Sequence, residues 1–215
     1  MNRIAPLLLL IVFFWFPEVK GQEISLPKFG IETKDSKLPV GLKPGDKAPF
    51  FTGYDQSGKT VDLKMLLEKG PIVLFFYRGK WCPICSRYLK NYQDSLNVIT
   101  DQGFSVVAIT PESIENVEQT IAMNKITFTV IYDCQEKIMT DFDVMFSVTK
   151  DYQNKVFSFS GIDISKNNGH DPAHLPVPAT FIINRHGIIT AVQFDPDYQN
   201  RASVQWMLKN LGGAL

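Results

Sequence analysis

Two cysteines spaced three positions apart, Cys82 and Cys85, are the residues of this sequence best suited to perform chemistry. They lie in the run Trp81-Cys82-Pro83-Ile84-Cys85, shortly after an apolar stretch over residues 72–77. A C-x-x-C spacing between a strand and a helix predicts a redox-active pair, because cysteines one helical turn apart can close a small disulfide. Unpaired N–H groups and the helix dipole stabilise a thiolate at such a helix N-terminus, and Pro83 suits the first helical position.

The two cysteines are expected to differ in role. We expect Cys82, at the helix N-terminus, to have a lowered pKa and to act as the attacking thiolate. We expect Cys85, about one turn further along the helix, to keep a more ordinary pKa and to act as the resolving thiol. Half of a zinc site and an inert structural disulfide are the alternatives. No metal is expected, because the chain has no second C-x-x-C to complete a zinc site.

Residues next to the cysteines could support this chemistry. Arg78 could stabilise a thiolate or bind a peroxide oxygen, and a surface salt bridge is its alternative use. Arg201 is a weaker candidate for the same electrostatic role. Trp81 and Tyr77 are either substrate contacts or aromatic residues of the core and its rim.

A proline precedes a late apolar stretch in the run Leu175-Pro176-Val177-Pro178-Ala179-Thr180-Phe181. A proline at this place can simply begin a strand. Near a C-x-x-C pair we predict instead a cis Val177–Pro178 bond. Such a bond would lay the chain antiparallel to an extended substrate bound beside Cys82.

The remaining cysteine and the histidines are expected to have ordinary structural positions. Cys134 follows a predicted strand and is expected to be a partly buried free thiol. His170 and His174 are four positions apart with Pro172 between them, so a loop is predicted there and a metal pair is not. His186 is predicted to lie in a hairpin turn.

The elements that must position these residues alternate along the chain. A turn at residues 55–58 is predicted between two short strands, followed by a short helix up to Lys69. Further strands are predicted at residues 72–77, 104–110, 127–132, 180–184 and 188–194, and helices at residues 82–102, 111–125, 134–142 and 202–211. The polar segment 145–175 interrupts this order and is interpreted as an insertion. The order predicts an α/β fold with a central mixed sheet and helices on both faces.

The order of strand, W-C-x-x-C, helix and proline before a late hairpin resembles a thioredoxin-like fold. The run from Phe76 to Cys85 resembles the peroxiredoxin-like branch of the alkyl hydroperoxide reductase/thiol-specific antioxidant family (AhpC/TSA, redoxin). Gly45 to Phe51, Pro178 to Gly187, and Asp195-Pro196-Asp197-Tyr198 followed by Arg201 match that family too. The resemblance covers about residue 42 to the C-terminus and is weakest at 145–175. It implies thiol redox chemistry without an organic cofactor.

One position departs from the family pattern. Typical members carry Pro-x-x-x-Thr/Ser-x-x-Cys before the peroxide-attacking cysteine. Here Phe75 and Gly79 occupy the Pro and Thr/Ser positions relative to Cys82. The hydroxyl that would orient a peroxide is therefore missing.

Three functions remain open. In the first, Cys82 attacks the disulfide of a substrate protein and Cys85 releases the reduced product, leaving the pair oxidised. In the second, Cys82 reduces a hydroperoxide and becomes a sulfenic acid that condenses with Cys85. Both need an upstream thiol electron donor. The third is a non-catalytic thioredoxin-like binding module, for which a disulfide potential below about −300 mV would be expected.

The N-terminus has the pattern of a secretory signal over residues 1–21. Arg3 precedes an unbroken apolar run from Leu7 to Phe16, and Gly21 suits cleavage before Gln22. The apolar run would span only about 15 Å as a helix, so no stable membrane span is expected after cleavage. An extended lead-in at residues 22–44 and one domain at 45–215 are predicted to remain, in the periplasm or secreted. Equal numbers of basic and acidic residues, 22 of each, give no electrostatic case for a nucleic-acid partner.

Overall fold

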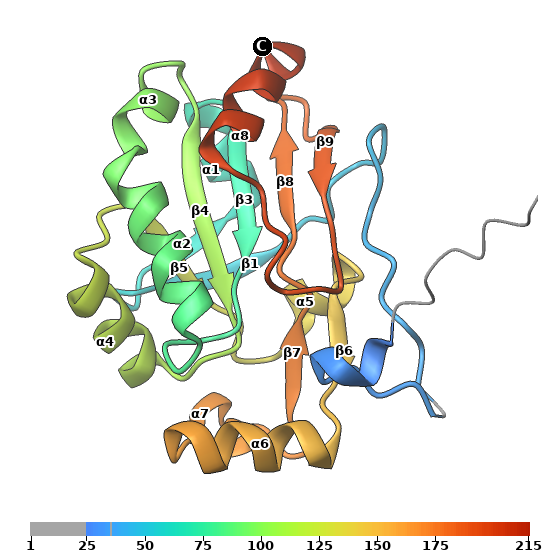
Figure 1. The fold of residues 1–215 in the computed structure, drawn as a ribbon. Coiled ribbons are helices and arrows are strands. Elements are labelled where there is room, and N and C mark those ends of the chain that lie inside the picture. Colours follow the sequence, from blue (N-terminus) through green and yellow to red (C-terminus); the bar gives the residue numbers. More distant parts are fainter. Residues whose placement is uncertain (1–24, 35) are drawn as a thin grey trace, which may run out of the picture.

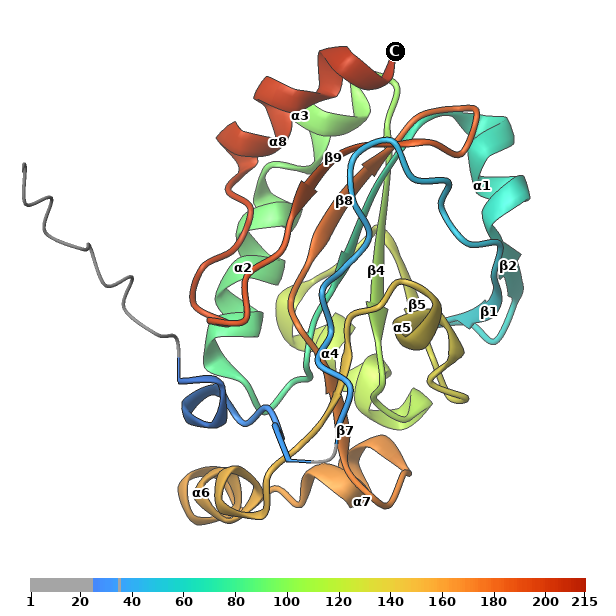
Figure 2. The same ribbon diagram turned by 90° about the vertical axis from the view of Figure 1, so that its right-hand side faces the viewer.

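A computed structural model describes residues 25–34 and 36–215, and Figures 1 and 2 show its ribbon in two views. The predicted signal segment, residues 1–21, lies outside the described residues. The predicted α/β fold is confirmed: a mixed sheet lies at the centre, with helices on both of its faces.

Within the described residues, the central sheet has 7 strands in the order β2-β1-β5-β4-β3-β8-β9. Its strands are β1 (Thr52–Asp55), β2 (Thr60–Asp62), β3 (Ile72–Phe76), β4 (Ser105–Thr110), β5 (Thr129–Tyr132), β8 (Thr180–Ile183) and β9 (Ile189–Gln193). β3 pairs parallel with β4, and β4 pairs parallel with β5. β8 runs antiparallel to both β3 and β9, and β1 runs antiparallel to β5 and β2.

The helices are amphipathic layers that bury the two faces of this sheet. One face packs against α2 (Pro83–Asp94), α3 (Leu96–Thr100), α4 (Ile114–Asn124) and α8 (Val204–Leu211). The other packs against α1 (Leu63–Lys69) and α5 (Lys137–Asp141). Val73 and Phe75 of β3 point to the first face, whereas Ile72 and Leu74 point to the second. This alternation explains why β3 is apolar throughout: a central strand covered on both sides has no solvent-facing position.

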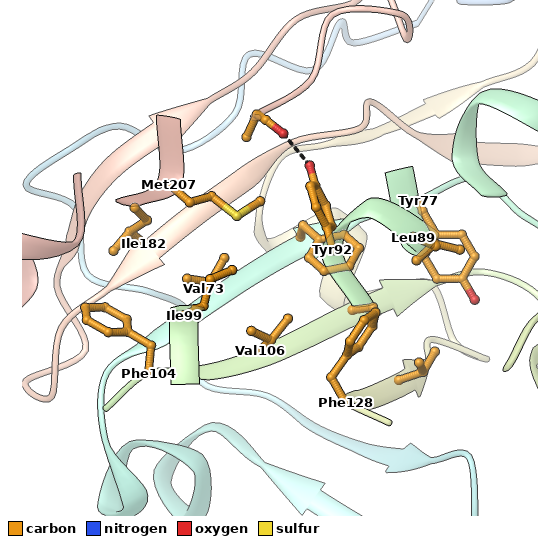
Figure 3. Close-up of a cluster of buried hydrophobic side chains, with 14 of the residues drawn as sticks. Val73, Tyr77, Leu89, Tyr92, Ile99, Phe104, Val106, Phe128, Ile182 and Met207 are labelled. Atoms are coloured by element: carbon orange, nitrogen blue, oxygen red, sulfur yellow. Dashed lines mark hydrogen bonds between the residues drawn. The ribbon is translucent and has the colours of Figure 1, made fainter. Parts of the chain in front are cut away.

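The core on the first face fixes helix α2, whose N-terminus carries the cysteines. Figure 3 shows Tyr92 of α2 among Val73, Val106 and other apolar side chains of this face. The Tyr92 hydroxyl donates a 2.6 Å hydrogen bond to the carbonyl of Ala202, which joins α2 to the segment before α8. Tyr77 belongs to the same core, so it is a core aromatic residue.

The predicted helix over residues 82–102 is divided in two. Ser95 separates α2 from α3, and its backbone (φ −109°, ψ 13°) departs from helical geometry. The apolar pattern of both pieces faces the same core, so the sequence pattern did not show the break.

Residues 145–175, predicted as a polar insertion, form a small ordered unit. It contains β6 (Met145–Ser147), α6 (Lys150–Ser160), α7 (Ile164–Asn168) and β7 (His174–Pro176), and β6 pairs antiparallel with β7. The unit lies at the end of the sheet where β3 and β4 finish, in the lower part of Figure 1. The lead-in packs against it: the 3₁₀ helix η1 (Leu26–Phe29) is followed by Ile31, which bridges to Val148. A second 3₁₀ helix, η2 (Gly212–Ala214), follows α8.

Candidate active site

Cys82 caps the N-terminus of α2, at the loop that follows β3. Its sulfur accepts a 3.4 Å hydrogen bond from the N–H of Cys85, and Pro83 is the first helical residue, as the sequence pattern predicts. Both cysteines are free thiols and are buried, with exposed fractions of 1% for Cys82 and 0% for Cys85. The predicted juxtaposition of the two cysteines is confirmed.

Arg78 is a buried partner of Cys82, with only 2% of its surface exposed. Its Nη2 donates to the Cys82 sulfur at 3.1 Å, and its Nη1 donates to the Tyr152 hydroxyl at 2.7 Å. The guanidinium also lies 3.7 Å from the ring centre of Tyr198. These contacts hold the cation in one orientation. Burial therefore rules out the surface salt bridge that was the alternative use of this residue.

Arg201 stands to Cys85 as Arg78 stands to Cys82. Its Nη2 donates to the Cys85 sulfur at 3.2 Å, and its Nε donates to the carbonyl of Tyr198 at 2.9 Å. The electrostatic role considered for Arg201 is supported by this contact, but it acts on the second sulfur. Each thiol of the pair consequently has its own guanidinium.

The two thiols ionise as a coupled pair. Burial opposes ionisation of Cys85, yet its pKa lies well below the ordinary value because of a hydrogen bond from Cys82 and the positive charges of Arg201 and Arg78. The pKa of Cys82 is raised by that hydrogen bond, by burial and by the negative charge of Cys85, against the opposing effect of Arg78. The pair thus favours one shared negative charge over two.

This distribution corrects the sequence-based expectation of a lowered pKa on Cys82 and an ordinary one on Cys85. That expectation considered only the helix N-terminus, which favours a thiolate on Cys82. In the folded chain, Arg201 approaches Cys85 and the thiol of Cys82 serves as its hydrogen-bond donor. These contacts lower the pKa of Cys85 relative to that of Cys82, opposite to the expectation from the helix N-terminus alone.

A cavity of about 150 Å³ opens onto Cys82. Most of its lining side chains are apolar or aromatic, and the charged ones are both cations. The lining residues are Arg78, Trp81, Cys82, Pro83, Ile84, Tyr152, Lys155, Val156, Phe159, Ser160 and Tyr198. Trp81 thus lines the cavity, which is the position expected if it contacts the substrate. Cys85 does not line the cavity, so a substrate that enters it meets Cys82 first.

The loop before Cys82 explains why the family hydroxyl is missing. Gly79 adopts a φ of 147°, and a Cβ built there would lie 2.7 Å from Trp81 Nε1 and 3.0 Å from Glu112 Oε1. Threonine or serine would therefore require this loop to shift. Glu112 is fully buried and accepts a 2.8 Å hydrogen bond from the N–H of Lys80, so it fastens the same loop. Burial raises the pKa of Glu112, although its hydrogen bonds with the Lys80 N–H and with the side chains of Thr120 and Asn167 lower it.

The predicted cis Val177–Pro178 bond is wrong. Over residues 25–34 and 36–215, the cis peptide bond is Asp171–Pro172. Val177 continues the line of β7, and its N–H donates to the carbonyl of Val144 at 2.8 Å. The chain therefore passes in an extended form into β8, which the ordinary trans bond allows. Val177 packs in the core of the insertion, and neither it nor Pro178 lines the cavity.

The third cysteine and the histidines lie away from the Cys82–Cys85 pair. Cys134 is exposed, which corrects the expectation of partial burial. His174 lies in β7 with its Nδ1 2.8 Å from Glu136 Oε2, and His170 Nε2 lies 2.8 Å from the carbonyl of Cys134. His186 lies in the predicted hairpin turn. In the part of the chain that the structure describes, no cluster of three or more His, Cys, Asp or Glu side chains is arranged to hold a metal.

Three residues of the site were not identified from the sequence. Tyr198 belongs to a run that matched the family, and this match was an available signal. No sequence signal pointed to Tyr152 or Glu112, because Tyr152 lies in the insertion and Glu112 lies directly after a strand. Among the described helices, none is both long enough and apolar enough to cross a bilayer.

The His174–Glu136 contact predicts a pH dependence of stability. A hydrogen bond with Glu136 raises the pKa of His174, against burial and with the added attraction of the carboxylate charge. The contact therefore stabilises the folded state most fully at pH values below the unfolded pKa, and this contribution disappears as the pH rises through the raised folded pKa. We expect His174→Gln to remove a pH-dependent contribution of no more than about 1 kcal/mol.

Urea unfolding between pH 5.5 and 8.5, roughly the span over which histidines titrate, measures this contribution. His186→Gln, in the exposed turn, is the matched control and should keep the wild-type slope. Equal slopes in His174→Gln and the wild type would contradict the prediction.

Tyr152→Phe tests whether the insertion orients Arg78. The change removes the hydroxyl that accepts from Arg78 Nη1 and leaves a buried donor without that partner. We expect iodoacetamide to alkylate the cysteine pair about threefold to tenfold more slowly at neutral pH, since a loosened Arg78 stabilises thiolate less. Tyr54→Phe, on an exposed tyrosine, is the control. An unchanged alkylation rate with unchanged stability would mean that Tyr152 has no orienting role.

Comparison with known proteins shows the family of this chain. The family model described as the AhpC/TSA family matches residues 44–192. A Mycobacterium tuberculosis protein provisionally named a peroxiredoxin is 30% identical over 99 residues, which are 46% of this chain and 62% of that protein. The chain thus spans less than two thirds of that relative. Chloroplastic peroxiredoxin Q of Sedum lineare is 27% identical over 156 residues, 71% of each chain.

A solved structure shows the same fold. The crystal structure of peroxidoxin BcpB from Mycobacterium tuberculosis superimposes with a TM-score of 0.62 over 80% of this chain and 96% of that one, at 19% identity. The predicted thioredoxin-like fold is thereby confirmed.

Proposed function

Because this chain belongs to the AhpC/TSA family, we propose that it is a thiol peroxidase in which Cys82 reduces a hydroperoxide and Cys85 resolves the product. One observation carries the proposal: the Cys82 sulfur lies at a cavity of about 150 Å³ with the Arg78 guanidinium 3.1 Å away. A small peroxide fits beside this sulfur, and the cation can stabilise the charge that develops on its oxygens.

The depth of the sulfur favours a peroxide over a protein disulfide. Only 1% of Cys82 is exposed, so a disulfide held in a folded substrate would have to enter the cavity. Val177 and Pro178, which were predicted to lie along an extended polypeptide substrate beside Cys82, do not line the cavity. The C-x-x-C pair itself still suits disulfide exchange through a mixed disulfide on Cys82, which is the second candidate function.

The proposed reaction has two chemical steps. First, the Cys82 proton passes across its hydrogen bond to the Cys85 thiolate, and the Cys82 thiolate attacks the peroxide R–O–O–H. The O–O bond breaks, the sulfur becomes a sulfenic acid, and the departing alkoxide takes a proton to leave as R–O–H. Next, Cys85 loses its proton and attacks the sulfenic sulfur. The S–S bond forms, and hydroxide leaves and is protonated to water. The dithiol supplies both electrons.

The contacts of each sulfur suit its step. The Cys82 thiolate would accept hydrogen bonds from Arg78 and from the N–H of Cys85. In the resolving step Arg201 would stabilise the Cys85 thiolate. In this chain Arg78 would also take over the peroxide-orienting task of the missing hydroxyl at position 79. A thiol electron donor must then reduce the Cys82–Cys85 disulfide for the next turnover.

Rapid mixing of the reduced protein with hydrogen peroxide tests the proposal. Trp81 lies beside the reacting pair and lines the cavity, so its fluorescence should report oxidation. We expect a second-order rate constant at least about a hundred times that of free cysteine, in line with the effect of positioning and electrostatic stabilisation. A rate no better than free cysteine would refute the peroxidase. Faster reaction with insulin disulfides would favour the second candidate.

Export belongs to the same proposal. The sequence pattern of residues 1–21 supports a secretory signal that is cleaved before Gln22, so the mature enzyme would act in the periplasm or outside the cell. N-terminal sequencing of the protein recovered from its expressing cells should then begin at Gln22. A sequence that begins at Met1 would refute cleavage.

A further inference from the structure

The Arg78 guanidinium beside Cys82 is enclosed by aromatic rings. Its central carbon lies 3.7 Å from the ring centre of Tyr198, 5.2 Å from that of Trp81 and 5.7 Å from that of Tyr152. Among the described residues, the Nε of this arginine is buried and has no hydrogen-bond partner. The orientation of the guanidinium toward the thiol therefore depends on its two terminal nitrogens and on the rings around it.

Two of these rings also contact the lead-in, which precedes the residues 44–192 that the family model matches. Phe29 is buried and packs edge-on against Tyr198, with the ring centres 6.1 Å apart and the ring planes at 88°. Gly30 (φ 90°) lies so close to Tyr152 that a Cβ built on it would be 2.6 Å from the Tyr152 Cγ. Neighbouring residues of one segment thus contact both tyrosine rings.

Backbone hydrogen bonds fix this segment to the insertion. The Gly30 carbonyl accepts from the N–H of Thr149, and the N–H of Glu32 donates to the carbonyl of Ser147, both at 2.9 Å. Ile31, between them, is buried and belongs to the core of the insertion. The 3₁₀ helix η1 consequently lies beside α6 (Figures 1 and 2). Since Thr149 caps α6, the lead-in also fixes the start of this helix.

We propose that Phe29 and Gly30 of the lead-in are positioning residues of the active site. They hold two tyrosine rings against the Arg78 guanidinium, and this contact keeps the cation aimed at the Cys82 sulfur. Because a nearby positive charge favours the thiolate, the lead-in raises the thiolate fraction of the cysteine pair. The inference goes beyond the proposed function, since it concerns the reactivity of the thiols toward any substrate.

Two substitutions disturb these contacts at separate points. In Gly30→Ala, the added Cβ would displace the Tyr152 ring, whose hydroxyl accepts from Arg78 Nη1. In Phe29→Leu, the side chain stays apolar but the edge-on contact with Tyr198 is lost. Neither substitution replaces a charged or titratable group near the thiols, and these groups are Tyr77, Arg78, Glu112, Tyr152, Tyr198 and Arg201. A shift in the pH dependence of the thiols would therefore report a change in position.

Alkylation of the reduced protein by iodoacetamide between about pH 5 and 9 measures the thiolate fraction. All proteins carry Cys134→Ser, so that the exposed third cysteine does not contribute. At neutral pH we expect each lead-in variant to be alkylated about twofold to tenfold more slowly, the range expected for the loss of one aromatic contact. We also expect the profile of rate against pH to move to higher pH, because a displaced cation stabilises the thiolate less.

Matched controls separate the position of Arg78 from general destabilisation. Gly45→Ala adds a Cβ at a glycine of similar φ, 97°, and no described atom lies within 4 Å of that Cβ. Phe51→Leu changes a buried phenylalanine that packs against Phe142 in the core on the other face of the sheet. Both should keep the wild-type profile. Urea unfolding checks that each variant is folded, and Phe29→Leu decides the outcome if Gly30→Ala does not fold.

Arg78→Met gives the decisive comparison, because the lead-in is inferred to act through this cation. Phe29→Leu should slow alkylation when Arg78 is present and should have no further effect in Arg78→Met. An equal effect in both proteins would overturn the inference, as would a wild-type profile in the folded lead-in variants. Slower alkylation without a shift of the profile would indicate obstructed access and would also overturn it. The proposed peroxidase is tested separately, because its failure would appear as slow oxidation of the wild type by hydrogen peroxide.

Discussion

Cys82→Ser is expected to abolish peroxide reduction. A serine hydroxyl cannot form a sulfenic acid, and the neighbouring Cys85 does not line the cavity and so cannot replace it. We expect turnover to fall by at least about three orders of magnitude, as for the loss of other catalytic nucleophiles. Consumption of peroxide in the presence of a reducing thiol measures this effect.

Cys85→Ser separates the two steps of the proposed reaction. Its Cys82 should still consume one equivalent of peroxide and should then accumulate as a sulfenic acid, which dimedone traps and mass spectrometry detects. Under the disulfide-exchange alternative, the same variant would instead trap mixed disulfides with a substrate protein. Cys134→Ser, at the exposed third cysteine, is the control and should retain turnover. Peroxidase activity that survives in Cys82→Ser would contradict the assignment of the attacking thiol.

Arg78→Met is expected to slow the oxidation of Cys82 about tenfold to a hundredfold at neutral pH. A hydrogen bond to a charged group contributes about 1.5–3 kcal/mol, and each 1.4 kcal/mol changes a rate about tenfold. Because the positive charge of Arg78 favours both thiolates, its loss should raise the pKa values of the pair. The profile of rate against pH should therefore move to higher pH.

Two comparisons show whether the oxidation rate depends on the planar geometry of the Arg78 guanidinium or only on its charge. Arg78→Lys keeps the positive charge but cannot donate to Cys82 and Tyr152 together in the same planar geometry, so we expect partial activity. Arg87→Met, on the exposed side of α2, changes an arginine away from the cavity and should react as the wild type does. Urea unfolding checks that each variant is folded. A wild-type rate and pH profile in a folded Arg78→Met protein would refute the role of this residue.

The order of elements could be predicted from the sequence because it rests on local patterns. The apolar run that became β3 and the turn at residues 55–58 between β1 and β2 are set by neighbouring residues. Two features could not be predicted from the sequence: the helix break at Ser95 and the ordered structure of residues 145–175. Both depend on what the helices pack against. The polar surface pattern of the insertion conceals a third core, which contains Tyr152, Val156 and Leu175.

The sequence by itself predicted the reactive pair and the elements that position it: two sulfurs one turn apart, at the junction of a buried strand and a helix. Spacing and capping act over a few residues, so they can be recognised from the order of the residues. Only the tertiary structure decided which guanidinium contacts which sulfur and which side chains line the cavity at Cys82. Arg201 reaches Cys85 across 116 positions and Tyr152 reaches Arg78 across 74, and such contacts exist only after the chain has folded.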